Sequence, residues 1–166
     1  WLQDFSVYAS PLVPVLDTVN INQSMKQCVE DIDITDITCI WSLLEDLPNI
    51  EADIGLLNHV WYQILTNSIE AIETSGIIKI TTKLGKCRTG SLQGQPAVEI
   101  HIADDGPGME IDIKRKVFIP FFSTKPHGDG IGLAMVERIV KAHNAEIQVR
   151  SAPNEGATFV VRLPIW

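Results

Sequence analysis

Residues 53–76 read DIGLLNHVWYQILTNSIEAIETSG, and this stretch decides the fold class. Asp53 is a typical N-cap residue, and Gly76 is expected to end the helix that begins there. The apolar residues between them recur at helical spacing and form one stripe, made up of Leu56, Leu57, Val60, Ile64, Leu65, Ala71 and Ile72. The sequence therefore predicts a long amphipathic helix.

Strand signals follow this helix along the chain. Residues 77–84 and 97–103 have the composition of strands, and the Gly-rich stretch 85–95 between them predicts a hairpin loop. Residues 146–150 and 157–163 predict two more strands. Because the strands do not alternate regularly with helices, they predict a mixed, largely antiparallel sheet.

The remaining segments complete an α/β (α+β) two-layer sandwich. Amphipathic helices are predicted at 20–32 and 131–143, with a short helix at 110–117. Residues 35–52 fit two short strands, or one strand and an irregular piece. We expect the helices to pack on one face of the sheet, and residues 118–130, which show no regular period, to form a mobile loop.

The composition narrows the class of protein. The chain has 166 residues, a formal charge of −8 and 45% hydrophobic residues, which suits one packed domain and disfavours a nucleic-acid partner. No apolar run approaches the ~18 residues of a membrane span, so this domain is expected to make no membrane contact. Three cysteines without a Cys-x-x-Cys pair indicate a reducing, cytoplasmic setting.

The N-terminal residues 1–19 are expected to be a linker. They contain Pro11 and Pro14 and show neither helical nor strand period. The chain begins with Trp1 rather than Met, which suggests that an upstream domain is missing. Residues 20–166 are then the folded domain.

Asn67 is the first candidate functional residue. It falls in the inward-facing row of the helix with Val60, Ile64 and Ala71, so its carboxamide needs a partner. Two interpretations stay open: a core Asn bonded to the backbone, or an oxygen ligand for a hard cation such as Mg²⁺, which shares its other positions with phosphates. Gln63 lies one turn earlier on the same face and could support it.

Asp104 begins an Asp-Asp-Gly-Pro-Gly turn directly after the predicted strand 97–103. Such a sequence is usually only a turn signal. A carboxylate at a strand end can also accept a hydrogen bond from an exocyclic amine, and Gly106 and Gly108 would let a flat ring approach the backbone. Adenine has such an amine.

Gly128-Asp-Gly-Ile-Gly132 opens the predicted helix 131–143. Free backbone N–H groups and the positive end of the helix dipole suit an anion there, although the motif can also be only a flexible helix start. Lys125 could add a positive charge. The chain has neither the Gly-x-Gly-x-x-Gly spacing nor a P-loop, so those two phosphate motifs are excluded.

Five motifs occur in a fixed order: QILTNSIEA (63–71), DDGPG (104–108), FIPFFSTK (118–125), GDGIGL (128–133) and EGATF (155–159). Together they resemble the N, G1, F, G2 and G3 boxes of sensor histidine kinases, which belong to the GHKL superfamily. The match runs from about Asp53 to Pro164. The resemblance implies a nucleotide-binding sandwich of helices over a mixed sheet.

The same resemblance implies roles for individual residues. Asn67 would coordinate a Mg²⁺ ion that bridges the ATP phosphates, and Asp104 would accept a hydrogen bond from the adenine amine. Gly106 and Gly108 would let the loop close on the base, and Thr158 would assist there. The loop 118–130 would form a lid, and contacts to the nucleotide are expected from Lys125, Gly128, Gly130, Ile131, Gly132 and Leu133.

Two departures from the family pattern bear on function. Gln63 stands where family members commonly carry Asn, and where the hydrolytic branches have a Glu that activates water. A neutral Gln cannot take that proton, so ATP hydrolysis as an end in itself is disfavoured. None of the four histidines lies in a phosphoacceptor pattern, so the acceptor is expected on an upstream dimerisation domain.

The sequence thus predicts the ATP-binding catalytic domain of a two-component sensor histidine kinase. It would transfer the γ-phosphoryl group of Mg-ATP to a histidine on the separate dimerisation domain, with a response-regulator receiver domain as a further partner. One alternative is a GHKL serine or threonine kinase, which shares the Asp-x-Gly-x-Gly turn. The other is a noncatalytic nucleotide-binding or docking module, in which Gln63 reports lost activity.

Overall fold

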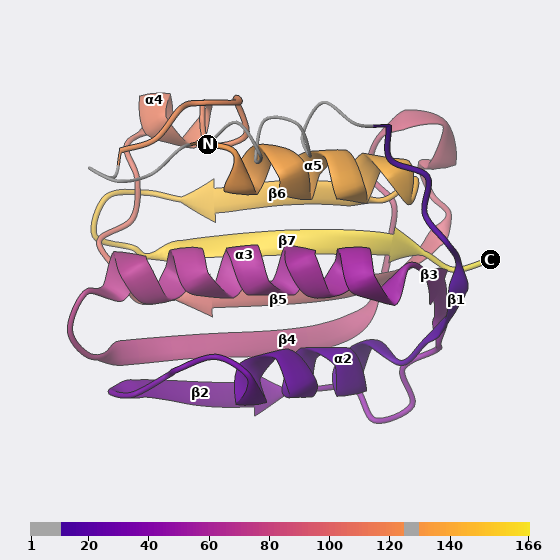
Figure 1. Cartoon of the computed structure of the whole chain (residues 1–166), viewed down its shortest axis with the longest axis horizontal. Helices are drawn as coiled ribbons and strands as arrows, with labels where there is room; N and C mark the ends of the chain where they lie inside the picture. The colour runs from indigo at the N-terminus through magenta and orange to yellow at the C-terminus, as the bar shows by residue number, and fades with distance from the viewer. Residues whose placement is uncertain (1–10, 125–129) are drawn as a thin grey trace.

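A computed structural model describes residues 11–124 and 130–166. Five strands form one sheet in the order β2-β4-β5-β7-β6, in which only the β2–β4 pair is parallel, and β1 and β3 form a separate antiparallel pair (Figure 1). The elements are β1 (Asp17–Val19), α2 (Ile21–Glu30), β2 (Ile37–Ser42), β3 (Ile50–Ala52), α3 (Ile54–Ile72), β4 (Gly76–Lys86), the 3₁₀ turn η1 (Gly90–Leu92), β5 (Pro96–Asp104), α4 (Ile111–Lys114), α5 (Gly132–Ala142), β6 (Glu146–Ser151) and β7 (Ala157–Pro164).

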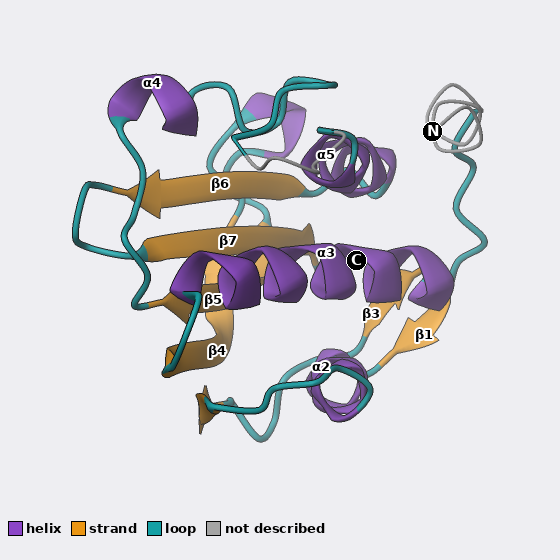
Figure 2. Cartoon of the chain, turned by 60° about the vertical axis from the view of Figure 1, so that its left-hand side comes forward, coloured by secondary structure: helices purple, strands orange, loops and turns teal. Residues whose placement is uncertain are grey.

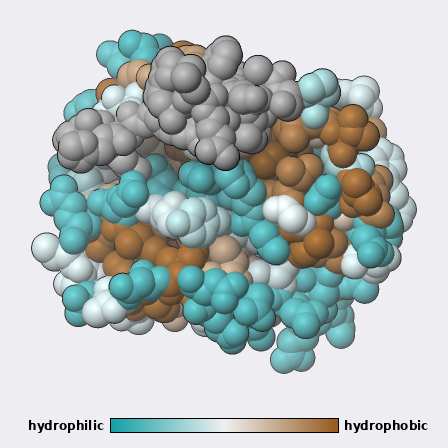
Figure 3. Space-filling view, in the orientation of Figure 1, coloured by the Kyte–Doolittle hydropathy of each residue, from teal (hydrophilic) through white to brown (hydrophobic). Residues whose placement is uncertain are grey.

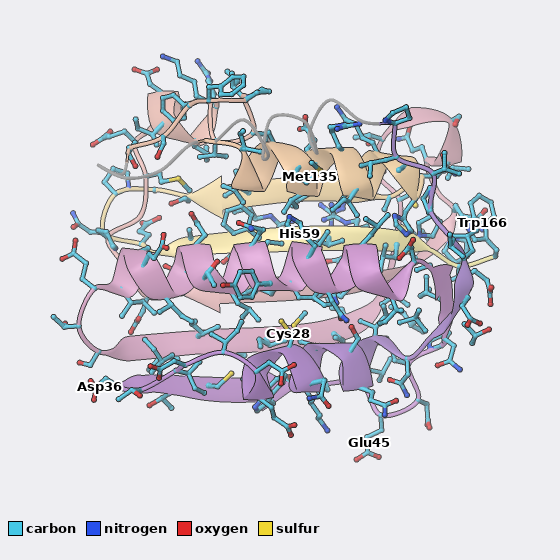
Figure 4. All side chains as sticks on the ribbon, in the orientation of Figure 1. Cys28, Asp36, Glu45, His59, Met135 and Trp166 are labelled. Atoms are coloured by element: carbon cyan, nitrogen blue, oxygen red, sulfur yellow. The ribbon has the colours of Figure 1, made fainter. Side chains whose placement is uncertain are left out.

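Helices α2, α3 and α5 lie on one face of the five-stranded sheet, as Figures 1 and 2 show. The apolar stripe of α3 and alternate residues of the strands form the core, in which Trp61, Ile100 and Phe159 are fully buried. Cys28 joins this core from α2, and Figure 4 shows it in the region between α2 and α3. The predicted two-layer sandwich with a mixed, largely antiparallel sheet is confirmed.

Helix α3 begins where the sequence predicts, because Asp53 Oδ1 accepts a hydrogen bond from Leu56 N at 3.1 Å. Its predicted end at Gly76 is wrong. The helix ends at Ile72, and Glu73 takes φ +67° and ψ −58° while Thr74 N donates to Ile72 O at 2.8 Å. This γ-turn stops the helix, and Gly76 is the first residue of β4 instead.

Residues 35–52 contain two strands that belong to different sheets, β2 in the large sheet and β3 in the small one. The partner of β3 is β1, in which Asp17 pairs with Ala52 and Val19 with Ile50. Three residues of the expected linker are therefore part of a sheet, while residues 1–10 lie outside the described part of the chain. The domain boundary at residue 20 stays a prediction.

Across residues 11–124 and 130–166, no helix is both long enough and apolar enough to cross a bilayer.

Candidate functional site

A cavity of about 750 Å³ lies between α3, the end of β5, the loop after α4 and the start of α5. It brings together residues from all five sequence motifs. The predicted site residues that line it are Gln63, Asn67, Asp104, Gly108, Gly130, Gly132 and Leu133. Asn67 and Asp104, which come from different elements 37 positions apart, therefore face the same space.

Asp104 is the last residue of β5, and its carboxylate is held from the backbone. Oδ1 accepts hydrogen bonds from Gly106 N at 2.9 Å and from Ala157 N at 3.3 Å. Oδ2 and the Ser68 hydroxyl are buried, and neither has a hydrogen-bond partner among the described residues. A donor from a bound molecule would satisfy Oδ2, because a buried acceptor without a partner is costly.

Burial raises the pKa of Asp104, and the hydrogen bonds from Gly106 and Ala157 oppose that rise. The Ser68 hydroxyl lies close enough to lower this pKa, yet it makes no hydrogen bond of ordinary geometry with the carboxylate. The carboxylate is therefore a fixed acceptor whose desolvation is only partly compensated by the protein.

The glycines of the following turn allow close backbone packing. Gly108 has φ +74°, and a Cβ there would fall on Ala152 O in the β6–β7 connection. Gly106 does not line the cavity, but a Cβ there would lie 3.2 Å from Ala71 O of α3, and its N–H holds Asp104. The turn is thus clamped between α3 and the β6–β7 connection.

Gln63 and Asn67 lie one turn apart on α3 and both line the cavity. A Cβ on Gly132 would fall on Gln63 Oε1, so the carboxamide of Gln63 occupies the space that this glycine leaves open. Eleven-residue α5 begins at Gly132 and directs its first backbone N–H groups toward its N-terminal end. Carboxamide oxygens and a helix N-terminus together suit an anion with a hard cation.

Several predicted residues lie elsewhere. Ile131 is 6% exposed and is absent from the cavity wall. Thr158 pairs with Ala103 in the sheet, and because Ala157 lines the cavity, the next side chain along β7 points to the opposite face. The structure therefore brings Ala157, and not Thr158, to the site. Lys125 and Gly128 lie outside the described residues.

Apart from Leu133, the sequence analysis missed the apolar part of the cavity wall. The missed apolar residues include Pro107, Met109, Ile113 and Val117. Of these residues only Ile113 lies in a helix, the short α4, and Met109 and Val117 lie in the segments before and after it. The cavity as a whole suits an elongated molecule with a flat amine-bearing group at one end and negative charge at the other.

Comparison with known protein families shows which family has this site. The family described as histidine kinase-, DNA gyrase B- and HSP90-like ATPase matches residues 52–166, which include both ends of the cavity. The chain belongs to this ATPase family. The family match includes every residue that lines the cavity.

Individual relatives of this chain are histidine kinases. The signal transduction histidine-protein kinase AtoS of Escherichia coli K12 is 40% identical over 126 residues, which are 76% of this chain and 19% of AtoS. The catalytic domain of histidine kinase ThkA has a TM-score of 0.74 and 28% identity over 90% of this chain and 95% of that domain. Full-length ShkA in complex with AMPPNP has a TM-score of 0.80 and 26% identity, over 98% of this chain and 34% of ShkA. The chain thus spans a small part of the length of AtoS.

Proposed function

We propose that residues 20–166 are the ATP-binding catalytic domain of a sensor histidine kinase. The observation that carries this proposal is that Asn67 and Asp104 line one cavity, which also has apolar side chains in its wall. Adenine would donate its amine hydrogen to Asp104 Oδ2, the buried acceptor that has no partner among the described residues. The triphosphate would extend toward Gln63, Asn67 and the start of α5.

The residues present fit a Mg²⁺ ion that is bound jointly with phosphates. Within the described ranges no three His, Cys, Asp or Glu side chains come together as a metal site, so the chain offers no cage of its own. Asn67 offers one carboxamide oxygen on the cavity wall, which suits a cation that keeps waters and phosphate oxygens as its other ligands. When bound, Mg²⁺ would neutralise charge on the transferring phosphoryl group.

The domain's own contribution is positioning. Asp104 would fix the base, Asn67 would hold the phosphate end, and the helix start at Gly132 would orient the anionic chain. Gln63 has no carboxylate to deprotonate water, which favours transfer to another acceptor over hydrolysis. That acceptor would be a histidine on an upstream dimerisation domain, and a response-regulator receiver domain would take the phosphoryl group next. A cytoplasmic location follows from the need for ATP.

The test is incubation of this chain with γ-labelled ATP, Mg²⁺ and a helical hairpin that carries a phosphoacceptor histidine. We expect label on the hairpin that is stable in base and lost in acid, as a phosphohistidine is. Acid-stable label would indicate a serine or threonine kinase, and ATP binding without transfer would indicate a docking module. Asn67→Ala is the negative control, and it must remain folded while it loses Mg²⁺-dependent binding.

A further inference from the structure

Asp53 joins three segments that are distant in the sequence. Its Oδ1 caps α3 through Leu56 N, and its Oδ2 accepts a hydrogen bond from Val15 N at 2.9 Å. Its own backbone N–H donates to Nε2 of His143, 90 positions away, at 3.0 Å. The N-terminal segment (residues 11–19), the start of α3 and the end of α5 therefore meet at one residue.

His143 is fixed at both ring nitrogens. Nδ1 lies 2.8 Å from Ile139 O, which can only accept, and Nε2 faces the Asp53 N–H, which can only donate. These partners assign the neutral ring with its proton on Nδ1. The residue is 7% exposed, and its backbone N–H also bonds Ile139 O at the end of α5. His143 is thus a buried side chain that links the end of α5 to the start of α3.

This connection lies far along the helices from the cavity. Helices α3 and α5 run side by side in opposite directions, so the end of α5 meets the start of α3 (Figure 1). At the other end of α5, Gly132 abuts Gln63 within the cavity wall. A shift at His143 would therefore change how the start of α5 faces Gln63 and Asn67, because a packed helix moves as a rigid rod.

The N-terminal segment has few other attachments. Val13 and Val15 are each 79% exposed, and hydrophobic surface gathers at this end of the molecule (Figure 3). Besides the Val15–Asp53 hydrogen bond, the described contacts of this segment are the β1–β3 pairing, the bond from Thr18 Oγ1 to Glu51 at 2.7 Å, packing of Leu12 on the core and burial of Val19 within it. A displacement of this segment would act on Asp53 directly, through the hydrogen bond from Val15 N.

We propose that Asp53 and His143 form a clasp that couples the N-terminal segment to the nucleotide cavity, and that both act as positioning residues for phosphoryl transfer. The proposal rests on the proposed function. Asp104 belongs to the sheet and is held by Gly106 and Ala157, so loosening the clasp should leave adenine binding intact. It should reduce the rate of transfer, because the phosphate end depends on α3 and α5.

The contacts of the clasp can be removed separately. His143→Leu removes the acceptor for Asp53 N–H, whereas His143→Gln places a carboxamide oxygen where Nε2 lies. Asp53→Asn keeps one oxygen to cap α3 but loses the second acceptor that holds Val15. Asn20→Ala is the matched control, because it removes a cap of the same kind from α2, where Asn20 accepts from Gln23 N at 3.0 Å.

The first measurement is kcat and KM for transfer to the histidine-bearing hairpin. We expect His143→Leu to lower kcat by about tenfold or more with KM for ATP within about twofold, since small misplacements of reacting groups are costly. His143→Gln should restore most of the rate, and Asn20→Ala should leave kcat unchanged. If His143→Leu only lowered stability, as Asn20→Ala does, the proposal would be overturned.

The second measurement is amide hydrogen exchange, which does not depend on transfer. A saturating nonhydrolysable ATP analogue should increase protection of the Val15 amide in the wild-type chain and not in His143→Leu or Asp53→Asn. Unchanged protection of Val15 in the wild type would overturn the clasp. If no nucleotide bound at all, the proposed function would fail by itself, and the clasp would still require faster exchange at Val15 and at the start of α5 in His143→Leu.

Discussion

The two ends of the cavity are built differently. At the Asp104 end, a strand residue is fixed by two backbone N–H groups, one from the following turn and one from the neighbouring strand β7. At the Gly132 end, the wall is a flexible Gln63 side chain that rests against a glycine at the start of α5. The first end is preformed by the sheet, whereas the second depends on how two helices face each other.

The largest effect is expected from Asn67→Ala at the helical end. The variant loses the carboxamide oxygen proposed as the Mg²⁺ ligand, so Mg²⁺-dependent ATP affinity should fall by about 100-fold, while the fold is kept. Titration calorimetry with and without Mg²⁺ measures this. Asn58→Ala on the same helix is the control, since Asn58 bonds Ser24 and is absent from the cavity wall. Equal loss in both variants would contradict the assignment.

Asp104→Asn tests the preformed end. The Asn oxygen can keep the bonds from Gly106 and Ala157, but its amide nitrogen would meet the adenine amine as a second donor. ATP affinity should fall by about 10- to 100-fold, which corresponds to ~1.5–3 kcal/mol for a charged hydrogen bond. The free energy of unfolding should rise, because burial of the charge is removed. Urea denaturation measures that rise, and lower stability would contradict this account of Asp104.

Gly132→Ala tests the helical end without touching the base. The new Cβ would displace the end of the Gln63 side chain, so ATP affinity should fall about fivefold to tenfold. Adenosine affinity should stay within about twofold, because the new Cβ would meet only Gln63 and none of the groups that hold Asp104. The second substitution Gln63→Ala in this variant should restore ATP binding. Failure of that rescue would show that the two residues are not coupled.

The pH dependence of stability provides a further test of the Asp104 end of the cavity, through the comparison of Asp104→Asn with the wild type. Because burial raises the pKa of Asp104, the folded state binds this proton more tightly than the unfolded state does. The stabilisation from that proton is complete below the ordinary carboxyl pKa and is lost as pH rises through the raised value. The stability advantage of Asp104→Asn should therefore be small in acid and grow with pH. A constant difference across that range would contradict the raised pKa.

The smallest effect is expected from Glu73→Gly, at the γ-turn that ends α3 beside the cavity. Glu73 has a positive φ that a non-glycine residue adopts at a cost, so the variant should be more stable by about 1 kcal/mol. Nucleotide affinity should hardly change. Thr74→Gly provides the comparison, because Thr74 has no positive φ and the same substitution there should destabilise the fold. Thermal unfolding distinguishes the two variants.

Much of the fold could be predicted from local patterns. The stripe on α3, the hairpin strands and the caps at Asn20 and Asp53 all follow from spacing and side-chain chemistry. The pairing of β1 with β3 could not, because a three-residue strand has too short a pattern and its partner lies more than 30 positions away. The helix end at Ile72 was missed because a γ-turn at Glu73 has no distinctive sequence.

The candidate site likewise has features that the sequence predicts and features that only the structure shows. Asn67, Asp104 and the glycines could be identified because hydrogen-bonding capacity and backbone freedom belong to the residue itself. Their meeting in one cavity, the choice of Ala157 over Thr158, and the link from Val15 through Asp53 to His143 depend on strand register and helix packing. Register and packing are set by contacts between distant segments, so only the tertiary structure decided them.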